Sequence, residues 1–185
     1  MKPNILTALF LLTMILSPQV KAKVLITQKE ALEAAFPSGE QWVLNSETKY
    51  LTLQQLKSAK ELSGHTISSA LVVRHRAKNK SSGKLEFVYT DTHRVRTHTE
   101  TLMLIVDADK KIRRVEVLAF EEPLEYMPKD QWYGKFEKSP LDAELEVKRR
   151  IPFVTGASLT AQASVQAARR ILAIHEVLEN HTVRP

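Results

Sequence analysis

The sequence contains no cysteine among its 185 residues. This absence excludes disulfide bonds, thiol chemistry, Fe–S clusters and covalently attached c-type haem. It also excludes a lipoprotein anchor, which requires a cysteine at the end of the leader. A protein of this sequence that carries electrons therefore needs either an organic cofactor or a metal held by nitrogen and oxygen ligands.

The sequence also lacks an apolar run of the length that a membrane span requires. The run Ile5–Leu16 is almost wholly apolar, but it has only about a dozen residues where a span needs about 20. Lys2 before this run and Val20–Ala22 after it complete the three parts of a secretory signal. Residues 1–22 are therefore predicted to be a signal peptide that is cleaved before Lys23, and an uncleaved N-terminal anchor is the alternative. The protein is expected to be exported, to the periplasm or to the outer face of the cytoplasmic membrane.

Neither sign of charge dominates the sequence. It has 27 Lys and Arg residues against 21 Asp and Glu residues, which gives a net charge of +6. Removing residues 1–22 takes away two lysines and no acidic residue, so the net charge falls from +6 to +4. In an exported chain, this small excess favours an acidic protein partner or a phosphorylated ligand, and no nucleic-acid partner is expected.

The first third of the mature chain contains two helix-start signals. Capping boxes at Thr27–Glu30 and Thr52–Gln55 predict the first turns of two helices. The first helix is expected to run through Phe36, and the second to end at Ser63–Gly64. The side chains expected on the buried face of the second helix are Leu53, Leu56 and either Ala59 or Leu62.

The middle of the chain has the alternation of apolar and polar residues that antiparallel strands show. A short strand is expected at 41–45, and a hairpin turn at Asp107–Lys111. The other expected strands are Ile67–Arg76, Lys84–Thr90, Thr97–Val106 and Ile112–Phe120.

The last part of the chain has the apolar spacing of a long helix. Residues four and three apart form one stripe, which consists of Leu159, Ala163, Ala167, Ile171, Ile174 and Leu178. The chain has no internal repeat and no low-complexity linker. Residues 23–185 are therefore predicted to be a single α+β domain, with an antiparallel meander, flanking helices and a long C-terminal helix.

Hydroxyl side chains are concentrated just before this last helix, in the sequence Thr155-Gly156-Ala157-Ser158-Leu159-Thr160. Gly156 permits a turn with positive φ, Ser158 is a natural N-cap, and Thr160 falls in the first helical turn. The N–H groups of that turn lack intrahelical partners, and the helix dipole favours an anion there. The small side chain of Ala157 would let a ligand approach the backbone. The pattern predicts a phosphate site, and a plain helix cap is the alternative.

The run Thr155–Thr160 resembles the flavinylation motif of FMN-binding domains, (Asp/Ser)-Gly-Ala-(Ser/Thr)-any-Thr. Such domains occur in the C subunit of the sodium-translocating NADH:quinone reductase, in the G subunit of the Rnf complex and in small exported flavoproteins. The resemblance implies that Thr160 carries FMN through a phosphoester bond, installed by an exported FAD:protein FMN transferase. In this sequence Thr155 stands where the family usually has Asp or Ser.

The resemblance extends with less detail over residues 67–178. Glu121-Glu122-Pro123 is similar to the Glu-Thr-Pro turn of the family, although Leu124-Glu125-Tyr126 replaces the Gly-Leu-Gly that usually follows. The cofactor-binding residues that the resemblance implies are Thr155, Gly156, Ala157, Ser158, Thr160 and Glu121.

These observations lead to two functional hypotheses. The first is an exported flavoprotein that carries electrons between a donor and an acceptor, either of which could be membrane-bound, and that is an electron-transfer protein more than a stand-alone enzyme. In such a protein the flavin supplies the redox chemistry. The second is a cofactor-free exported binding module, in which the motif serves only as a helix cap.

The histidines and acidic pairs suggest little further chemistry. His93 and His98 are expected on opposite faces of a strand, which disfavours a metal site between them. Arg94, Arg96 and His98 are expected to share one face, where an anionic partner would fit. The last helix is expected to expose its histidines, which are His175 and His181. Glu121 and Glu122 would point in opposite directions on a strand, so they do not predict an acid–base pair.

Three aromatic residues, Tyr126, Trp132 and Tyr133, lie in an irregular, charged segment between Pro123 and Pro140. One interpretation is that they pack this segment onto the sheet. The other is that one of their rings flanks the isoalloxazine of the flavin.

Overall fold

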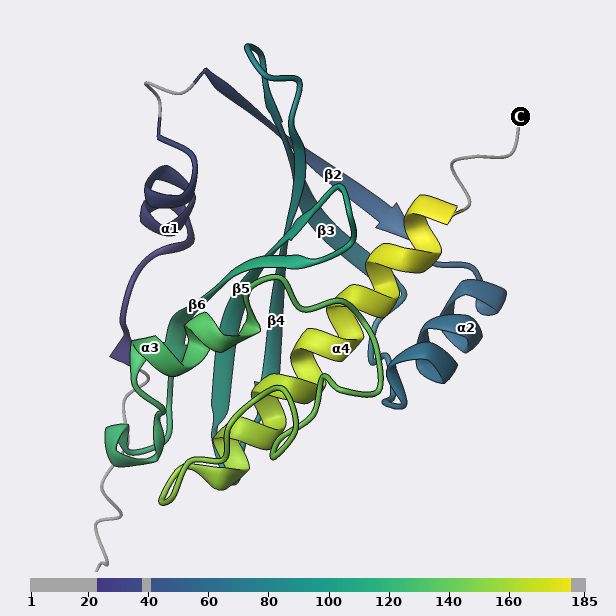
Figure 1. Ribbon diagram of the computed structural model, residues 1–185. Helices are drawn as coiled ribbons and strands as arrows, with labels where there is room; N and C mark the ends of the chain where they lie inside the picture. The colour runs from purple at the N-terminus through teal and green to yellow at the C-terminus, as the bar shows by residue number, and fades with distance from the viewer. Residues whose placement is uncertain (1–22, 38–40, 181–185) are drawn as a thin grey trace, which may run out of the picture.

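The structure is a computed structural model, and it describes residues 23–37 and 41–180. The predicted signal peptide and His181 lie outside these residues. The described chain forms one antiparallel sheet with helices on both faces, and a long C-terminal helix crosses one of those faces (Figure 1). The predicted α+β class and meander are confirmed.

The sheet has six strands in the order β1-β6-β5-β4-β3-β2, and every neighbouring pair is antiparallel. The strands are β1 (Lys23–Val24), β2 (Trp42–Tyr50), β3 (Leu71–Asn79), β4 (Leu85–Arg94), β5 (Thr99–Asp107) and β6 (Ile112–Phe120). The last strand has the predicted bounds, whereas β2 extends well beyond the predicted 41–45. The predicted strand at Ile67–Arg76 begins four residues later, because Ile67–Ala70 belong to the connection that precedes it.

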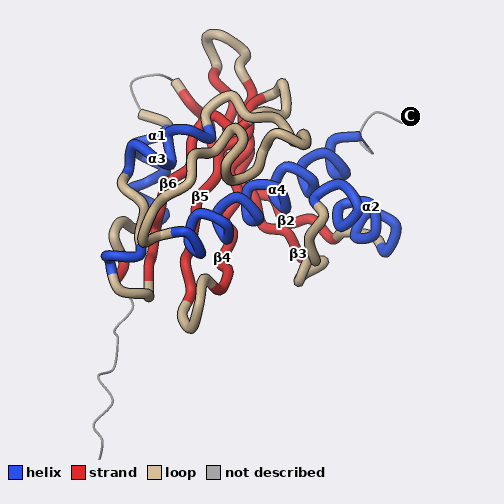
Figure 2. The backbone as a smooth tube through the Cα atoms, turned by 60° about the horizontal axis from the view of Figure 1, so that its bottom comes forward, coloured by secondary structure: helices blue, strands red, loops and turns tan. Residues whose placement is uncertain are grey.

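Two hydrophobic cores lie on opposite faces of the sheet, since successive residues of a strand point to opposite sides. Tyr89, Leu102 and Leu104 face the long helix α4 (Ser158–Asn180). Val88, Met103 and Ile105 belong to the other core, together with helix α1 (Gln28–Ala35). Figure 2 shows α4 lying along the sheet with helix α2 (Leu53–Ser63) beside its C-terminal half.

Both predicted capping boxes are present. The side chains of Thr27 and Thr52 each accept a hydrogen bond from the third N–H group of their helix. The side chains of Glu30 and Gln55 in turn accept the backbone N–H of the capping threonine. Helix α2 ends at Gly64, which adopts the left-handed conformation with φ 75°, a backbone geometry that glycine adopts without strain.

The predicted buried face of α2 is wrong at Leu53, which is 86% exposed, and Leu62 is exposed as well. Leu56 is half-buried and Ala59 is buried, as expected. The helix instead turns Gln55, Ala59 and Ser63 inward. Gln55 is satisfied there because its Nε2 donates to the carbonyl of Val177 on α4, at 3.2 Å.

Helix α4 is buried on most sides. The predicted stripe is confirmed from Ala163 to Leu178, whereas Leu159 at its start is 47% exposed. The prediction that His175 lies on the surface is wrong, because this side chain is only 1% exposed. The hydroxyl of Tyr89 lies 2.9 Å from His175 Nδ1 and 3.1 Å from Arg74 Nη1, so a polar network fills the space between α4 and the sheet.

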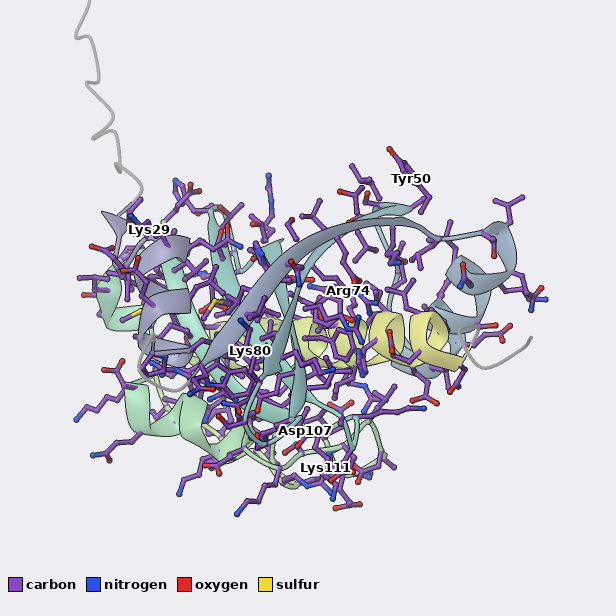
Figure 3. The ribbon with its side chains drawn as sticks, turned by 90° about the horizontal axis from the view of Figure 1, so that it is seen from above. Lys29, Tyr50, Arg74, Lys80, Asp107 and Lys111 are labelled. Carbon is purple, nitrogen blue, oxygen red and sulfur yellow. The ribbon has the colours of Figure 1, made fainter. Side chains whose placement is uncertain are left out.

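Figure 3 shows Arg74 of this network against α4, whereas Tyr50 at the end of β2 points out into solvent. The segment between β6 and α4 contains only short helical turns, namely η2 (Leu124–Tyr126), α3 (Asp130–Tyr133) and η3 (Gly134–Phe136). Within the part of the chain that the structure describes, we find no helix that is long and apolar enough to cross a membrane.

Candidate functional site

The backbone turn before α4 determines where the helix begins. Gly156 has φ 84°, and the N–H of Ala157 donates to the carbonyl of Val154 at 3.3 Å. A Cβ at Gly156 would meet no atom within 4 Å, so the turn requires glycine for its backbone conformation and not for space. The carbonyl of Ala157 then accepts the N–H of Ala161 at 2.9 Å, which is the first hydrogen bond of the helix.

The prediction that Ser158 is the N-cap is therefore wrong. The turn at Gly156 places Ala157 at the cap position, and Ser158 becomes the first helical residue. Alanine has no side-chain oxygen, so it cannot cap the N–H groups of the first turn as Ser or Asp would. These N–H groups are the ones that an anionic ligand uses at a helix start.

Thr160 lies in this first turn and is only 1% exposed. Its side-chain hydroxyl donates to the main-chain carbonyl of Tyr126, at 2.6 Å. This bond ties η2 to the start of α4. The guanidinium of Arg96 lies 5.1 Å from the centre of the Tyr126 ring, an arrangement that favours a cation–π contact.

These elements enclose a small pocket of about 130 Å³. The residues that line it are Arg96, Tyr126, Gly156, Ala157, Ser158, Leu159 and Thr160. The pocket combines a cationic side chain with the positive end of a 23-residue helix, and both favour an anion.

Pocket size limits what can enter. Sites for complete small-molecule ligands have volumes of about 300–1,000 Å³, so this pocket can take a phosphate group but not a whole flavin nucleotide. A ring system attached to that phosphate would lie outside it. Three large apolar side chains on the segments that form the pocket are exposed to solvent, and they are Leu124, Phe153 and Leu159. The residues present therefore leave room for a phosphate group inside the pocket, and Leu159 is an exposed apolar side chain in its lining.

Three residues that line the pocket were not in the cofactor set implied by the resemblance, and of these Arg96 is the charged one; the other two are Tyr126 and Leu159. Arg94, Arg96 and His98 were expected to share a strand face, but Val95–His98 form the turn between β4 and β5, where the N–H of Val95 donates to the carbonyl of His98 at 3.0 Å. The basic residues of this stretch indicated an anion-binding surface. The sequence did not reveal that, of the three, only Arg96 lines the pocket.

Glu122 holds this turn in place. One of its oxygens accepts the N–H groups of Arg96, Thr97 and His98, at 2.7–3.1 Å. Burial alone would raise the pKa of Glu122, but these three hydrogen bonds and the nearby His98 outweigh it and lower the pKa. The turn that presents Arg96 is thus built around an ionised carboxylate.

Two members of the expected cofactor set do not line the pocket. The carboxylate of Glu121 accepts the N–H and the hydroxyl of Thr99, at 3.2 and 2.8 Å, so it closes the end of the β5–β6 pair. Thr155 is exposed just before the turn. Gly156, Ala157, Ser158 and Thr160 are brought together as expected.

Of the three aromatic residues between Pro123 and Pro140, two pack against the core and one lines the pocket. Trp132 and Tyr133 are buried and pack edge to face, and Trp132 Nε1 donates to the carbonyl of Pro152 at 2.8 Å. Tyr133 donates to Glu100 at 2.7 Å. The packing interpretation is confirmed for these two rings. Tyr126 is half-buried and lines the pocket, where it could flank a ligand.

The histidines on either side of the β4–β5 turn have separate partners. His93 points toward α4 and bonds Asp91 and Glu100, whereas His98 contacts Thr97 in the turn. Among residues 23–37 and 41–180, no group of three His, Cys, Asp or Glu side chains is arranged to hold a metal ion. Comparison of the chain with family models, with curated proteins and with solved structures gives no match.

Proposed function

We propose that this protein is an exported flavoprotein electron carrier that holds FMN through a phosphoester bond to Thr160. The observation that supports the proposal is the pocket at the start of α4. Arg96 and the first helical turn, which includes Thr160, line this pocket together. Three segments far apart in the sequence contribute to it. The pocket supports the same residue as the flavinylation-like sequence Thr155–Thr160, because it adds Arg96 and Tyr126 from distant parts of the chain.

Each part of the pocket would have a separate task. The phosphoester carries a negative charge, which the N–H groups of Ser158–Thr160 and the guanidinium of Arg96 would neutralise. The exposed apolar side chains of Leu124 and Leu159 would cover one side of the ring. The FMN supplies the exchange of electrons, and the protein supplies attachment and orientation.

Attachment requires a local movement of the protein. The Thr160 hydroxyl is buried and bonded to the Tyr126 carbonyl, so the η2 turn must move away before a transferase can reach it. The Thr160 oxygen then attacks the phosphorus on the FMN side of FAD, its proton passes to a base of the transferase, and AMP leaves. The ester oxygen has no proton, so the Tyr126 carbonyl needs a new donor, and the exposed backbone of η2 can take one from water.

The partners of the proposed carrier follow from this chemistry. They are the exported FAD:protein FMN transferase, an electron donor and an electron acceptor, and no nucleic acid is among them. The mildly basic net charge of the mature chain favours redox partners with acidic surfaces.

A cofactor-free binding module is the second candidate, and one observation favours it. The bond from Thr160 to Tyr126 gives the hydroxyl a purely structural use, since it fastens η2 to α4. In that case the pocket would bind a free anion or a partner's phosphate, and Thr160 would carry nothing.

Intact-mass measurement separates the two candidates. The full chain is exported in cells that also produce the transferase, purified and denatured before the measurement. The carrier should gain the mass of one FMN less one water and fluoresce in a denaturing gel, and Thr160→Val should show neither property. An unmodified mass for the wild-type chain, obtained with a transferase that modifies a known substrate in the same cells, would reject the carrier.

A further inference from the structure

A group of polar side chains, of which Glu100 is buried and the other two are half-buried, lies against α4. His93 and Asp91 come from β4 and Glu100 comes from β5, and we call these three residues the His93 cluster. His93 Nδ1 lies 2.9 Å from Asp91 Oδ1, and His93 Nε2 lies 3.0 Å from Glu100 Oε2. A carboxylate can only accept hydrogen bonds, so both ring nitrogens carry a proton when both carboxylates are ionised.

The partners of the cluster fix its charge. Asp91 is paired with the guanidinium of Arg170 on α4, at 2.7 and 3.2 Å. Glu100 is fully buried and accepts the hydroxyl of Tyr133 at 2.7 Å. With His93 protonated, two cations balance two carboxylates. Loss of one proton leaves a net negative charge in the protein interior, which is costly.

The balance of forces on His93 favours its charged form. Burial lowers the pKa of His93, but the hydrogen bonds and charges of Asp91 and Glu100 outweigh it and raise the pKa above its usual value. Burial likewise raises the pKa of Asp91, and His93 and Arg170 outweigh it and lower that pKa. The charged groups that face His93 are thus Asp91 and Glu100. Arg170 lies against Asp91 and Tyr133 against Glu100, and His65 is near Arg170.

Ser164 connects the cluster to the residue that would carry the cofactor. Its hydroxyl oxygen lies 2.9 Å from Glu100 Oε2 and 2.8 Å from the carbonyl of Thr160. The hydroxyl has a single proton, which can satisfy only one of these two acceptors fully. Ser164 lies four residues after Thr160, about one helical turn along α4. The cluster is therefore connected to the backbone of Thr160 through a single side chain.

The cluster also has a route to solvent. A cleft of about 350 Å³ reaches Asp91, His93 and Arg170 between the α2–β3 connection and α4. Thr66, Ser68 and Gln166 also line it. A proton can pass between water in this cleft and the His93 ring without crossing the core.

Resting on the proposed function, we propose that the His93 cluster is a proton-binding site that exchanges one proton with solvent in step with the charge of the flavin attached at Thr160. The redox donor supplies the electrons, and the added negative charge attracts one proton from water through the cleft to His93. The proton returns to water when the electrons leave. Exchange is greatest at pH values near the pKa of His93, where the site is partly filled. The cluster does not touch the cofactor, and it acts through its charge alone.

The first measurement needs no cofactor. The side-chain nitrogens of His93 are followed by NMR as a function of pH in Thr160→Val protein, which cannot be flavinylated. His93 should titrate above the ordinary histidine range. Glu100→Gln keeps a partner for Tyr133 and removes one charge, so it should move the titration down by about 1–3 pH units. A His93 that titrates at an ordinary pH and does not respond to Glu100→Gln would overturn the proposal.

The second measurement follows the reduction potential of the flavinylated protein between pH 5.5 and 9. One proton per two electrons adds a slope of about 30 mV per pH unit, the value for a tenfold change in the equilibrium constant of a two-electron couple. This added slope should be absent in His93→Gln. In Glu100→Gln it should appear over a lower pH range than in the wild-type protein. The control is His75→Gln, which alters a half-buried histidine on the other face of the sheet.

The two proposals fail in different ways. A flavinylated protein whose potential keeps the same pH dependence in His93→Gln would overturn the proton site and leave the carrier intact. A wild-type chain without flavin would reject the carrier and with it the coupling. If His93→Gln fails to fold, the pH dependence of the reduction potential in Glu100→Gln serves as the test. A dependence equal to that of the wild-type protein would also overturn the proton site.

Discussion

The side-chain hydroxyl of Thr160 donates a 2.6 Å hydrogen bond to the main-chain carbonyl of Tyr126, 34 residues earlier in the sequence. The bond joins η2 to the first turn of α4, and both elements contribute residues to the pocket. It makes the same atom a structural contact before modification and the proposed ester oxygen afterwards. Substitutions at Thr160 therefore have two readouts, stability and flavin content, which need not change together.

We predict that Thr160→Val abolishes covalent flavin completely, because the ester has no oxygen to form on. The same variant should lose about 1 kcal/mol of stability, since the hydrogen bond between Thr160 and the partly buried Tyr126 carbonyl is lost. Thr160→Ser is the matched control, because it retains a hydroxyl and removes only a methyl group. It should keep both the bond to Tyr126 and measurable flavin. In-gel fluorescence and urea unfolding give the two readouts, and a fluorescent Thr160→Val band would move the attachment to another residue.

We predict that Arg96→Gln slows flavin attachment by about 10- to 100-fold, the effect of losing a charged hydrogen bond of about 1.5–3 kcal/mol. The side chain lies over Tyr126 and lines the pocket, so it would hold the phosphate before the ester forms. Arg94→Gln is the matched control, since Arg94 is also basic and exposed but does not line this pocket. The rate of mass gain with purified transferase checks the prediction, and equal rates in both variants would remove Arg96 from the phosphate site.

We predict that Ser158→Ala lowers stability by less than about 0.5 kcal/mol, the usual range for a surface substitution. Ser158 was expected to be the N-cap, where its loss would cost about 1 kcal/mol, but Ala157 occupies that position. Ser158 still lines the pocket, so the variant should lower flavin content more clearly than it lowers the melting temperature. A fall in melting temperature with full flavin content would restore the capping role.

The strands could be predicted because their signal is local. Ile112–Phe120 has the predicted bounds, since a polar turn at Asp107–Lys111 precedes an alternating apolar run. The burial of α2 could not be predicted, because its inward side chains include Gln55 and Ser63. These polar residues are satisfied by partners such as the Val177 carbonyl, and a pattern of apolar residues does not reveal such partners.

The residues of the candidate site also fall into those that the local sequence indicated and those that only the folded chain brings together. Gly156–Thr160 are adjacent in the sequence, and their spacing alone indicated a helix start suited to a phosphate. Arg96 and Tyr126 come from a hairpin turn and a short helical turn, which only the folded chain brings to the same place. The His93 cluster was also beyond sequence reasoning, because Glu100 of β5 meets His93, and Arg170 of α4 meets Asp91, only in the folded chain.

We predict that the mature protein begins at Lys23, which follows from the secretory signal in residues 1–22. Cleavage there leaves β1 intact, with Val24 opposite Ala119 on β6. N-terminal sequencing of the exported protein is the measurement. Material that starts at Met1 would show that the leader is kept as an anchor, and Ala22→Pro, which should block cleavage, provides a size standard for that form.

We predict that the protein loses stability on mild acidification because of His175. Burial, aided by Arg74 and Lys110 and opposed by Glu179, lowers the pKa of this side chain to about 4, whereas an unfolded chain has a histidine pKa of about 6.5. Between these values the unfolded state binds a proton that the folded state does not. The free energy of unfolding therefore falls as the pH drops from about 6.5 to about 4, by about 3 kcal/mol for a shift of this size.

The variant His175→Gln isolates this contribution. Gln does not titrate, and its carbonyl can accept the Tyr89 hydroxyl that His175 Nδ1 accepts in the wild-type protein. His93 does not interfere, because its pKa is raised and it is protonated in both states throughout most of this window. Urea unfolding at pH 7 and pH 4.5 should show a larger loss in the wild-type protein than in His175→Gln. Equal losses would mean that His175 takes up its proton without unfolding, and that the network with Tyr89 and Arg74 accommodates an imidazolium.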